Sequence, residues 1–254
     1  MKKYLLTYAA GDHYATFQRK MEKRAKFTGQ FDDVLMWGPQ DISQDFKRKH
    51  RRILSQPIGA GLWLWKPYII LQALKKVAKD SLVFYCDVDH IVVGLLDKYF
   101  AQAQENDIVL FDENGLKKRC ATAYECTASG TFSYMNCARD RYFSRRMVVG
   151  GYNFWKSDVK AISFVREWLY WCCNENVLLP AQVDVNSIGA VLSRPQDLET
   201  TQYGKRPTMM HCFDQSVLTI LAEKYNIGAH QTPVFSGELQ ELDMKTGKGK
   251  VFNV

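Results

Sequence analysis

The sequence predicts an α/β fold with a mostly parallel central sheet and helices on both faces. Short apolar runs alternate with segments of helical periodicity, the pattern of parallel strands joined by crossover helices. The first run, residues 3–10, is apolar throughout, as expected for a strand that is covered on both faces. Because the chain has 254 residues, 46% of them apolar, and no Pro/Gly/Ser-rich linker, we expect a single domain over residues 1–254.

The elements of the first half follow from apolar runs and turn residues. A turn at Gly11 and Asp12 separates the first strand from a helix, and Gly38 with Pro39 closes the second strand. Pro67 suits the first position of the next helix, which feeds into a buried strand. The predicted strands are residues 3–10, 34–37, 81–86 and 108–111, and the predicted helices are residues 12–27 and 67–79.

The second half has fewer clear signals. Residues 115–146 are polar and basic with weak periodicity, and we assign them no element. Residues 147–155 are predicted to form a strand in which a glycine pair marks a bulge or a close approach of ligand to backbone. Ser157 is predicted to cap a strong helix, and a last helix starts near Asp214 and ends before Gly228. A polar tail from residue 237 is expected to be mobile.

The most informative feature is a pair of carboxylates, Asp87 and Asp89, at the end of the strand over residues 81–86. In an open α/β sheet, ligands bind at the edge where such strands end. Residues i and i+2 of an extended segment point the same way, so both side chains are predicted to offer oxygen ligands to one divalent cation, Mn²⁺ or Mg²⁺. The alternative is that the two acids merely cap a loop.

Residues 87–100, which read DVDHIVVGLLDKYF, resemble the D-x-D-x-I-V-x-G-x-L-x-x-L-F segment of GT-A glycosyltransferases, especially family 8 and its relatives. The resemblance implies a Rossmann-like GT-A fold and a metal-dependent transfer of sugar from a nucleoside diphosphate, with uridine as the expected nucleoside. It further implies a nucleotide-sugar-binding half over residues 1–112 and an acceptor and catalytic half over residues 113–236. By the same analogy, the donor is bound by Thr7, Tyr8 and Ala9 around the base and by Val88 within the D-x-D segment.

A second segment, GAGLWLWKPY over residues 59–68, combines a glycine loop, two tryptophans and Lys66 just before a predicted helix start. Backbone amides at a helix N-terminus together with a lysine make an anion site. In the enzymes that this chain resembles, the start of that helix contacts donor phosphate or sugar, commonly through arginine, and Lys66 would take that place. The alternative is that Trp63 and Trp65 are core residues and Lys66 lies at the surface.

Two later segments fit the same resemblance. Gly150 and Gly151 resemble the glycine-containing strand that lies beside the donor sugar in family 8, and small residues let a sugar approach the main chain. Asp214 and Gln215 resemble the D-Q element near the reacting sugar, which implies a catalytic role, although Asp214 also suits a helix N-terminus.

One part of the family 8 pattern is missing. These enzymes usually take a third metal ligand from a late histidine in an H-x-x-G-x-x-K-P-W-like segment, which this chain lacks. The candidates for that ligand are His211 and His230.

The formal net charge of +7 suggests an anionic partner, and the densest basic run is KRKHRR over residues 47–52. We expect this run to make peripheral contact with a membrane that carries the acceptor, which would be a glycan, lipid-linked or protein acceptor. No recognisable nucleic-acid-binding motif accompanies the basic residues, so nucleic acid is not an expected partner. The sequence shows no apolar membrane span or signal peptide, and seven cysteines without metal spacing suit a reducing compartment, so a cytoplasmic protein is expected.

Two other functions fit the acid pair. Phosphatases resembling the haloacid-dehalogenase group also place D-x-D after a strand, with the first aspartate as nucleophile. That motif normally lies near the N-terminus, and this chain shows no convincing later acidic pair. A non-catalytic nucleotide-sugar-binding protein is the third possibility.

Overall fold

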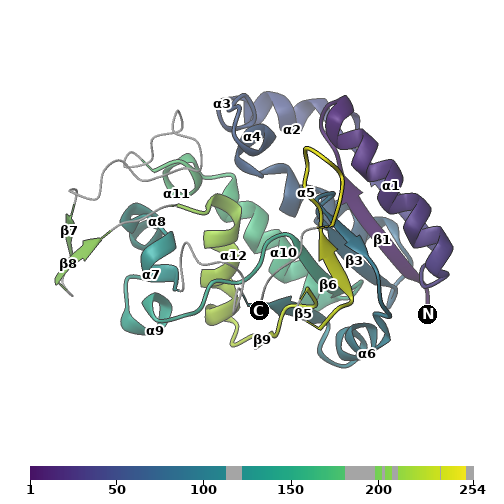
Figure 1. The fold of residues 1–254 in the computed structure, drawn as a ribbon. Helices are drawn as coiled ribbons and strands as arrows, with labels where there is room; N and C mark the ends of the chain where they lie inside the picture. Colours follow the sequence, from purple (N-terminus) through teal and green to yellow (C-terminus); the bar gives the residue numbers. More distant parts are fainter. Residues whose placement is uncertain (113–121, 181–197, 202–203, 208–210, 235, 250–254) are drawn as a thin grey trace.

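The computed structural model describes residues 1–112, 122–180, 198–201, 204–207, 211–234 and 236–249. A six-stranded sheet in the order β2-β1-β3-β6-β5-β9 forms its centre (Figure 1). β1 pairs in parallel with β2 and β3, and β5 with β9, whereas β6 runs antiparallel between β3 and β5. The strands are β1 (Lys3–Tyr8), β2 (Asp33–Trp37), β3 (Leu82–Cys86), β5 (Ile108–Phe111), β6 (Tyr152–Lys156) and β9 (Ala229–His230).

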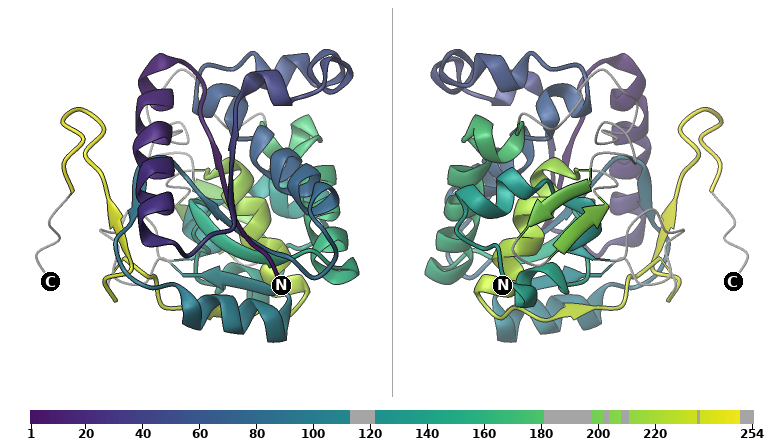
Figure 2. Two further views of the ribbon diagram at one scale, coloured as in Figure 1. Left: turned by 90° about the vertical axis from the view of Figure 1, so that its right-hand side faces the viewer. Right: turned by 90° about the vertical axis from the view of Figure 1, so that its left-hand side faces the viewer.

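The strands bury side chains on both faces, which explains their apolar sequences. Leu5 and Leu6 of β1 belong to two different core clusters, as do Phe84 and Tyr85 of β3. The cluster containing Leu5 and Phe84 packs against α1 (Asp12–Thr28) and α6 (Asp97–Asn106). Figure 2 shows α1 on one side of the sheet and α5 on the other.

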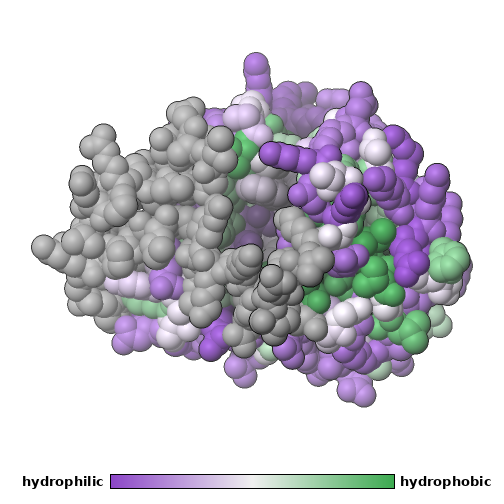
Figure 3. Space-filling model, viewed as in Figure 1, coloured by the Kyte–Doolittle hydropathy of each residue, from purple (hydrophilic) through white to green (hydrophobic). Residues whose placement is uncertain are grey.

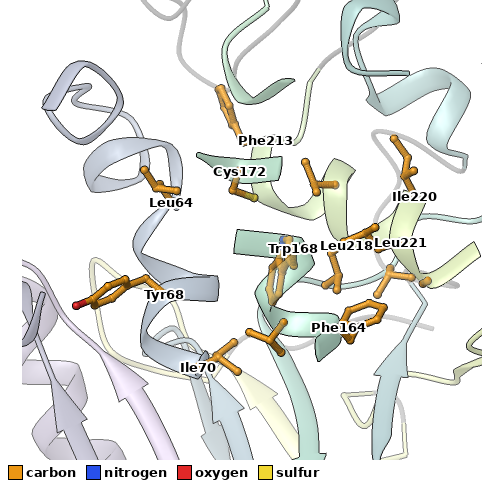
Figure 4. Close-up of a cluster of buried hydrophobic side chains, with 14 of the residues drawn as sticks. Leu64, Tyr68, Ile70, Phe164, Trp168, Cys172, Phe213, Leu218, Ile220 and Leu221 are labelled. Carbon is orange, nitrogen blue, oxygen red and sulfur yellow. The ribbon is translucent and has the colours of Figure 1, made fainter. Parts of the chain in front are cut away.

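The opposite face carries the larger core, built mainly from α5, α10 and α12. Trp168 of α10 is fully buried in this cluster (Figure 4). Its indole nitrogen donates a hydrogen bond to the carbonyl oxygen of Asp214, which anchors α10 to the start of α12. The helices on this side are α2 (Gln44–Lys49), α3 (Arg51–Leu54), α4 (Gly59–Leu62), α5 (Trp65–Lys76), α7 (Ala123–Cys126), α8 (Ser129–Tyr134), α9 (Asp140–Phe143), α10 (Val159–Cys172), α11 (Glu175–Leu178) and α12 (Phe213–Lys224).

Two small strand pairs complete the described fold. β7 (Leu198–Thr201) pairs with β8 (Gly204–Pro207). β4 (His90–Val92), which follows the acid pair, pairs antiparallel with β10 (Leu239–Glu241). The sequence analysis expected the C-terminal segment to be mobile, but its beginning forms a paired strand. Leu239 of this strand is apolar and is buried against the α1 face of the sheet.

Several predicted boundaries were wrong. α5 begins at Trp65 rather than Pro67, so Lys66 lies inside its first turn, where a following proline is tolerated because the first amides of a helix have no intrahelical partner. β6 begins at Tyr152, which leaves Gly150 and Gly151 just before the strand. Asp158 rather than Ser157 caps α10, since its carboxylate accepts a hydrogen bond from the amide of Ala161.

The cysteines also differ in part from expectation. Cys126 is disulfide-bonded, whereas five cysteines of the described residues are free: Cys86, Cys137, Cys172, Cys173 and Cys212. No helix within the described ranges is long and apolar enough to span a membrane.

Candidate active site

Asp87 and Asp89 lie where β3 leaves the sheet, beside the end of the neighbouring parallel strand β1. The backbone there turns, because the amide of His90 donates to the carbonyl oxygen of Asp87 at 3.1 Å. The extended conformation assumed from the sequence is therefore wrong, yet both acids line one cavity of about 450 Å³. Its lining residues are Tyr8, Ala10, Tyr14, Pro57, Gly59, Ala60, Trp63, Trp65, Asp87, Val88, Asp89 and Met244.

Both oxygens of Asp87 accept hydrogen bonds from buried groups. The hydroxyl of Tyr85, two residues earlier on β3, donates to Oδ1. The ammonium of Lys66 donates to Oδ2 at 3.1 Å and to the carbonyl oxygen of Gly150 at 3.1 Å. The same ammonium lies 3.9 Å from Oδ2 of Asp214, so one buried cation lies between two carboxylates.

Burial and charge act against each other in this cluster. Burial alone would lower the pKa of Lys66, but Asp87 and Asp214 outweigh it, and the pKa is raised. Lys66 is therefore a charged ammonium at neutral pH. Burial raises the pKa of Asp214 to about 7, although Lys66 opposes that shift. Within the described part of the chain, Oδ2 of Asp214 is buried and has no hydrogen-bond partner.

A second cavity of about 290 Å³ adjoins the first, because Asp87 and Trp63 line both. Gly151 also lines it, and a Cβ atom placed there would lie 3.3 Å from Oδ2 of Asp87. Its full lining is Ile58, Trp63, Lys66, Asp87, Gly151, His211, Cys212, Phe213, Asp214 and Gln215. The molecular face in Figure 3 is visibly hollowed near its centre.

The first strand contributes to the larger cavity mainly through Tyr8. Its ring stacks on Trp65 with 3.9 Å between centroids and 16° between planes. Ala9 is buried and donates its amide to the carbonyl oxygen of Trp37, and Val88 packs against it. Thr7 is fully buried, and among the described residues its hydroxyl oxygen has no hydrogen-bond partner.

The chemistry of the acid pair suits a divalent cation, since two carboxylates line one cavity and the side chain of Asp89 is 41% exposed. Oδ1 of Asp89 lies 2.6 Å from Nδ1 of His90. Burial would raise the pKa of Asp89, but His90 outweighs this effect and the pKa is lowered, which keeps the carboxylate ionised.

The structure does not bring either candidate third ligand to this pair. Both ring nitrogens of His211 lie within hydrogen-bond distance of backbone groups, 3.3 Å from the amide of Ala128 and 3.2 Å from the carbonyl oxygen of Leu178. His230 lies on β9, which β6 and β5 separate from β3 by roughly 14 Å of sheet. Within the described ranges, no three His, Cys, Asp or Glu residues form a group that could hold a metal.

The glycine segment before Lys66, which includes the short element α4, forms a left-handed turn rather than a flexible loop. Positive φ angles run through five residues: Gly59, Ala60, Gly61, Leu62 and Trp63. Left-handed backbone costs roughly 1–2 kcal/mol for each non-glycine residue. Leu62 is fully buried, and its packing helps to keep this strained backbone in place beside both cavities.

The sequence analysis missed several site residues, of which Tyr85, His90 and Met244 are the most informative. Tyr85 and His90 hold the acid pair, and Met244 of the C-terminal segment lines the larger cavity. Tyr85 precedes Asp87 by two residues on a strand, so period-2 alternation could have placed both side chains on one face. Met244 carried no sequence signal, because only the pairing of β10 with β4 brings the C-terminal segment here.

No family model matches the sequence, and no curated protein matches it significantly. Solved structures similar to this chain include a glycosyltransferase involved in glycosylation of the major capsid of PBCV-1, with 10% identity, 69% of this chain and 68% of that chain covered, and a TM-score of 0.40. Mouse xyloside xylosyltransferase 1 in its apo form shows 10% identity over 91% of this chain and 85% of its own, with a TM-score of 0.42. The galactosyltransferase LgtC, in complex with donor and acceptor sugar analogs, shows 13% identity over 92% and 82%, with a TM-score of 0.37.

The structure confirms the predicted α/β fold with a mostly parallel sheet between helices.

The left-handed turn allows a stability test with two opposite substitutions. Gly61→Ala should lower the free energy of unfolding by roughly 2–4 kcal/mol, because φ is +101° and the new Cβ would lie 2.8 Å from Cα of Leu54. Ala60→Gly should be neutral or stabilising by up to about 1 kcal/mol, because glycine adopts φ of 50° without strain. Urea unfolding measures both, and equal effects of the two variants would contradict the described turn.

The raised pKa of Asp214 predicts a pH-dependent stability. The folded protein keeps a proton on Asp214 up to about pH 7, whereas the unfolded chain releases it near the ordinary value of 3.8, so this residue makes stability fall as pH rises between those values. Asp214→Asn should therefore raise the free energy of unfolding by roughly 1–4 kcal/mol more at pH 8 than at pH 4. Chemical denaturation without added metal, with Asp45→Asn as a surface control, measures this difference. Parallel pH profiles for Asp214→Asn and the wild type would contradict it.

Proposed function

We propose that this protein is a metal-dependent glycosyltransferase that moves a sugar from a nucleoside diphosphate, with uridine diphosphate as the first candidate, to an acceptor hydroxyl. The observation that carries the proposal is the position of Asp87. It lines a large cavity together with Asp89, and it lines a second cavity together with Lys66 and Asp214. In a nucleotide-sugar donor, a charged diphosphate connects a nucleoside to a sugar. Such a donor would suit two cavities that share an acid.

The larger cavity suits the nucleoside and the diphosphate. Tyr8 and Trp65 line it with stacked rings, and such aromatic surfaces accept a planar base. Asp87 and Asp89 lie in the same cavity and would hold Mn²⁺ or Mg²⁺. When bound, the cation would neutralise the negative charge of the diphosphate as it leaves.

The second cavity suits the sugar. Asp214 and Gln215 lie in the first turn of α12 and provide groups for sugar hydroxyls. The ionised form of Asp214 would offset the positive charge that develops at the anomeric carbon. Gly150 and Gly151 leave space beside these two residues, because a Cβ at Gly150 would lie 3.4 Å from Cβ of Gln215. The bond from the anomeric carbon to the diphosphate oxygen breaks, a bond to the acceptor oxygen forms, and the hydroxyl proton passes to the diphosphate or solvent.

Lys66 acts in this proposal as a positioning residue. Its side chain is 4% exposed, and its ammonium is held by Asp87 and the Gly150 carbonyl, so it orients both while it offsets the charge of two carboxylates. This differs from the phosphate contact that its sequence position suggested. Asp87 and Gly150 would then keep one geometry in the absence of substrate.

A cytoplasmic location with peripheral membrane contact is part of the proposal, and the acceptor would be a glycan, a lipid-linked acceptor or a protein. The basic run over residues 47–52 lies on α2 and α3 and in the residue between them. Ion pairs of Arg48 with Asp45 and of Arg52 with Glu175 reduce its available charge.

The membrane part of the proposal has its own test. Reversing the charge of Lys47, Arg48, Arg51 and Arg52 should reduce sedimentation with phosphatidylserine vesicles at least tenfold, because each basic residue near such a surface contributes about 1 kcal/mol. Reversal of Lys75 and Lys76 in α5 is the control. Vesicle binding that survives the fourfold reversal would remove this contact from the proposal.

The central test concerns Asp89, the more exposed acid of the pair. Asp89→Asn should lower sugar transfer or donor hydrolysis at least 100-fold and should abolish the stabilisation of uridine diphosphate binding by Mn²⁺. A screen of nucleotide sugars by thermal shift, with and without Mn²⁺, identifies the donor, and calorimetry compares the variant with Asp45→Asn. Unchanged metal-dependent binding in Asp89→Asn would refute the metal assignment. Phosphate release from p-nitrophenyl phosphate that depends on Asp87 would favour a phosphatase, and tight donor binding without turnover would favour a binding protein.

A further inference from the structure

Trp63 is a prominent residue of the site that the proposed reaction does not yet use. It lines both cavities, and its side chain is neither buried nor fully exposed. Trp65, two residues later, differs because it is buried and stacked on Tyr8. The two tryptophans of the segment therefore have different surroundings, and only Trp65 is accounted for by the nucleoside cavity.

The backbone holds the Trp63 indole in place at an energetic cost. Trp63 is the last residue of the left-handed turn, with φ of 56°. Gly59 lies directly against the indole, since a Cβ there would be 2.4 Å from Cδ2 and Cε3 of the ring. Phe213 packs nearby with 5.8 Å between ring centroids. A strained turn that positions a partly exposed aromatic ring at two cavities indicates a function for that ring.

The lining of the second cavity combines two kinds of chemistry. Lys66, Asp87 and Asp214 carry charged groups, whereas Ile58, Trp63 and Phe213 form an apolar lining. A pyranose has the same division, because its hydroxyls need hydrogen-bonding groups and its axial C–H groups form an apolar face. Aromatic rings accept such apolar faces with their negative π surface.

We propose that the apolar lining seats a sugar ring of the acceptor against Trp63, so the acceptor is a carbohydrate rather than a bare lipid or peptide hydroxyl. This inference rests on the proposed function, which assigns the nucleoside to the larger cavity and the donor sugar to the groups beside Asp214. The apolar lining of the second cavity is then left for a second sugar.

Direct binding tests the inference without turnover. Saturation-transfer NMR with methyl glycosides of glucose, galactose, mannose, xylose and N-acetylglucosamine should show binding of at least one to the wild type, strongest at the C–H groups of one ring face. Trp63→Leu should weaken the binding at least tenfold, and Trp63→Phe should weaken it less because an aromatic face remains. Trp171→Leu, on the outer part of α10, is the matched control. Failure of all five glycosides to bind, or equal losses in Trp63→Leu and Trp63→Phe, would overturn the inference.

Gly59→Ala provides a second variant that displaces the indole without removing it. It should weaken glycoside binding as Trp63→Leu does, and in transfer assays both should raise KM for the glycoside more than they lower kcat. A loss that appears in uridine diphosphate affinity instead would assign Trp63 to the donor and overturn the inference. A different result would contradict the proposed function: the wild type would bind no nucleotide sugar, with or without Mn²⁺, even though it binds a glycoside.

Discussion

The ammonium of Lys66 is the contact on which the whole site depends. It joins α5 to the end of β3 through Asp87, to the segment before β6 through the Gly150 carbonyl, and to α12 through Asp214. A buried charge is tolerated only when partners and hydrogen bonds compensate for lost hydration. Removing this cation would leave the carboxyl groups of Asp87 and Asp214 without the charge between them. The same contact that orders the site therefore also makes these elements depend on one another for stability.

Two neighbouring features of the site lower the stability of the folded protein. Asp214 has a buried oxygen without a hydrogen-bond partner in the described chain, and the turn from Gly59 to Trp63 has left-handed backbone at residues other than glycine. Both lie beside the cavities, whereas the core around Trp168 is closely packed and hydrogen-bonded. Unsatisfied groups and strain persist only where surrounding structure enforces them, and they concentrate at functional sites. Their joint position supports the assignment of the site independently of the acid pair.

The sequence predicted the parts of this protein that depend on local pattern. The buried strands and the long amphipathic helices α1 and α10 are visible in periodicity, and Asp87 and Asp89 follow a strand that ends at the expected sheet edge. The antiparallel direction of β6 was not predictable, because an apolar strand has the same pattern in either direction. The partners of Lys66 were also hidden, since α5, α12 and the segment before β6 meet only after the sheet has formed.

The C-terminal segment shows how a distant part of the chain adjusts the acid pair. The amide of Leu242 donates to the carbonyl oxygen of Asp89, and β10 pairs with β4 directly after it. Leu242 itself is buried with Val88, the residue between the two acids. Displacing this segment would remove the hydrogen bond to Asp89. Lys66 and Tyr85 would still hold Asp87. The two acids are thus fixed by different parts of the protein, one by the buried charge cluster and the other by β10 and the residues that follow it, and donor binding would be sensitive to both.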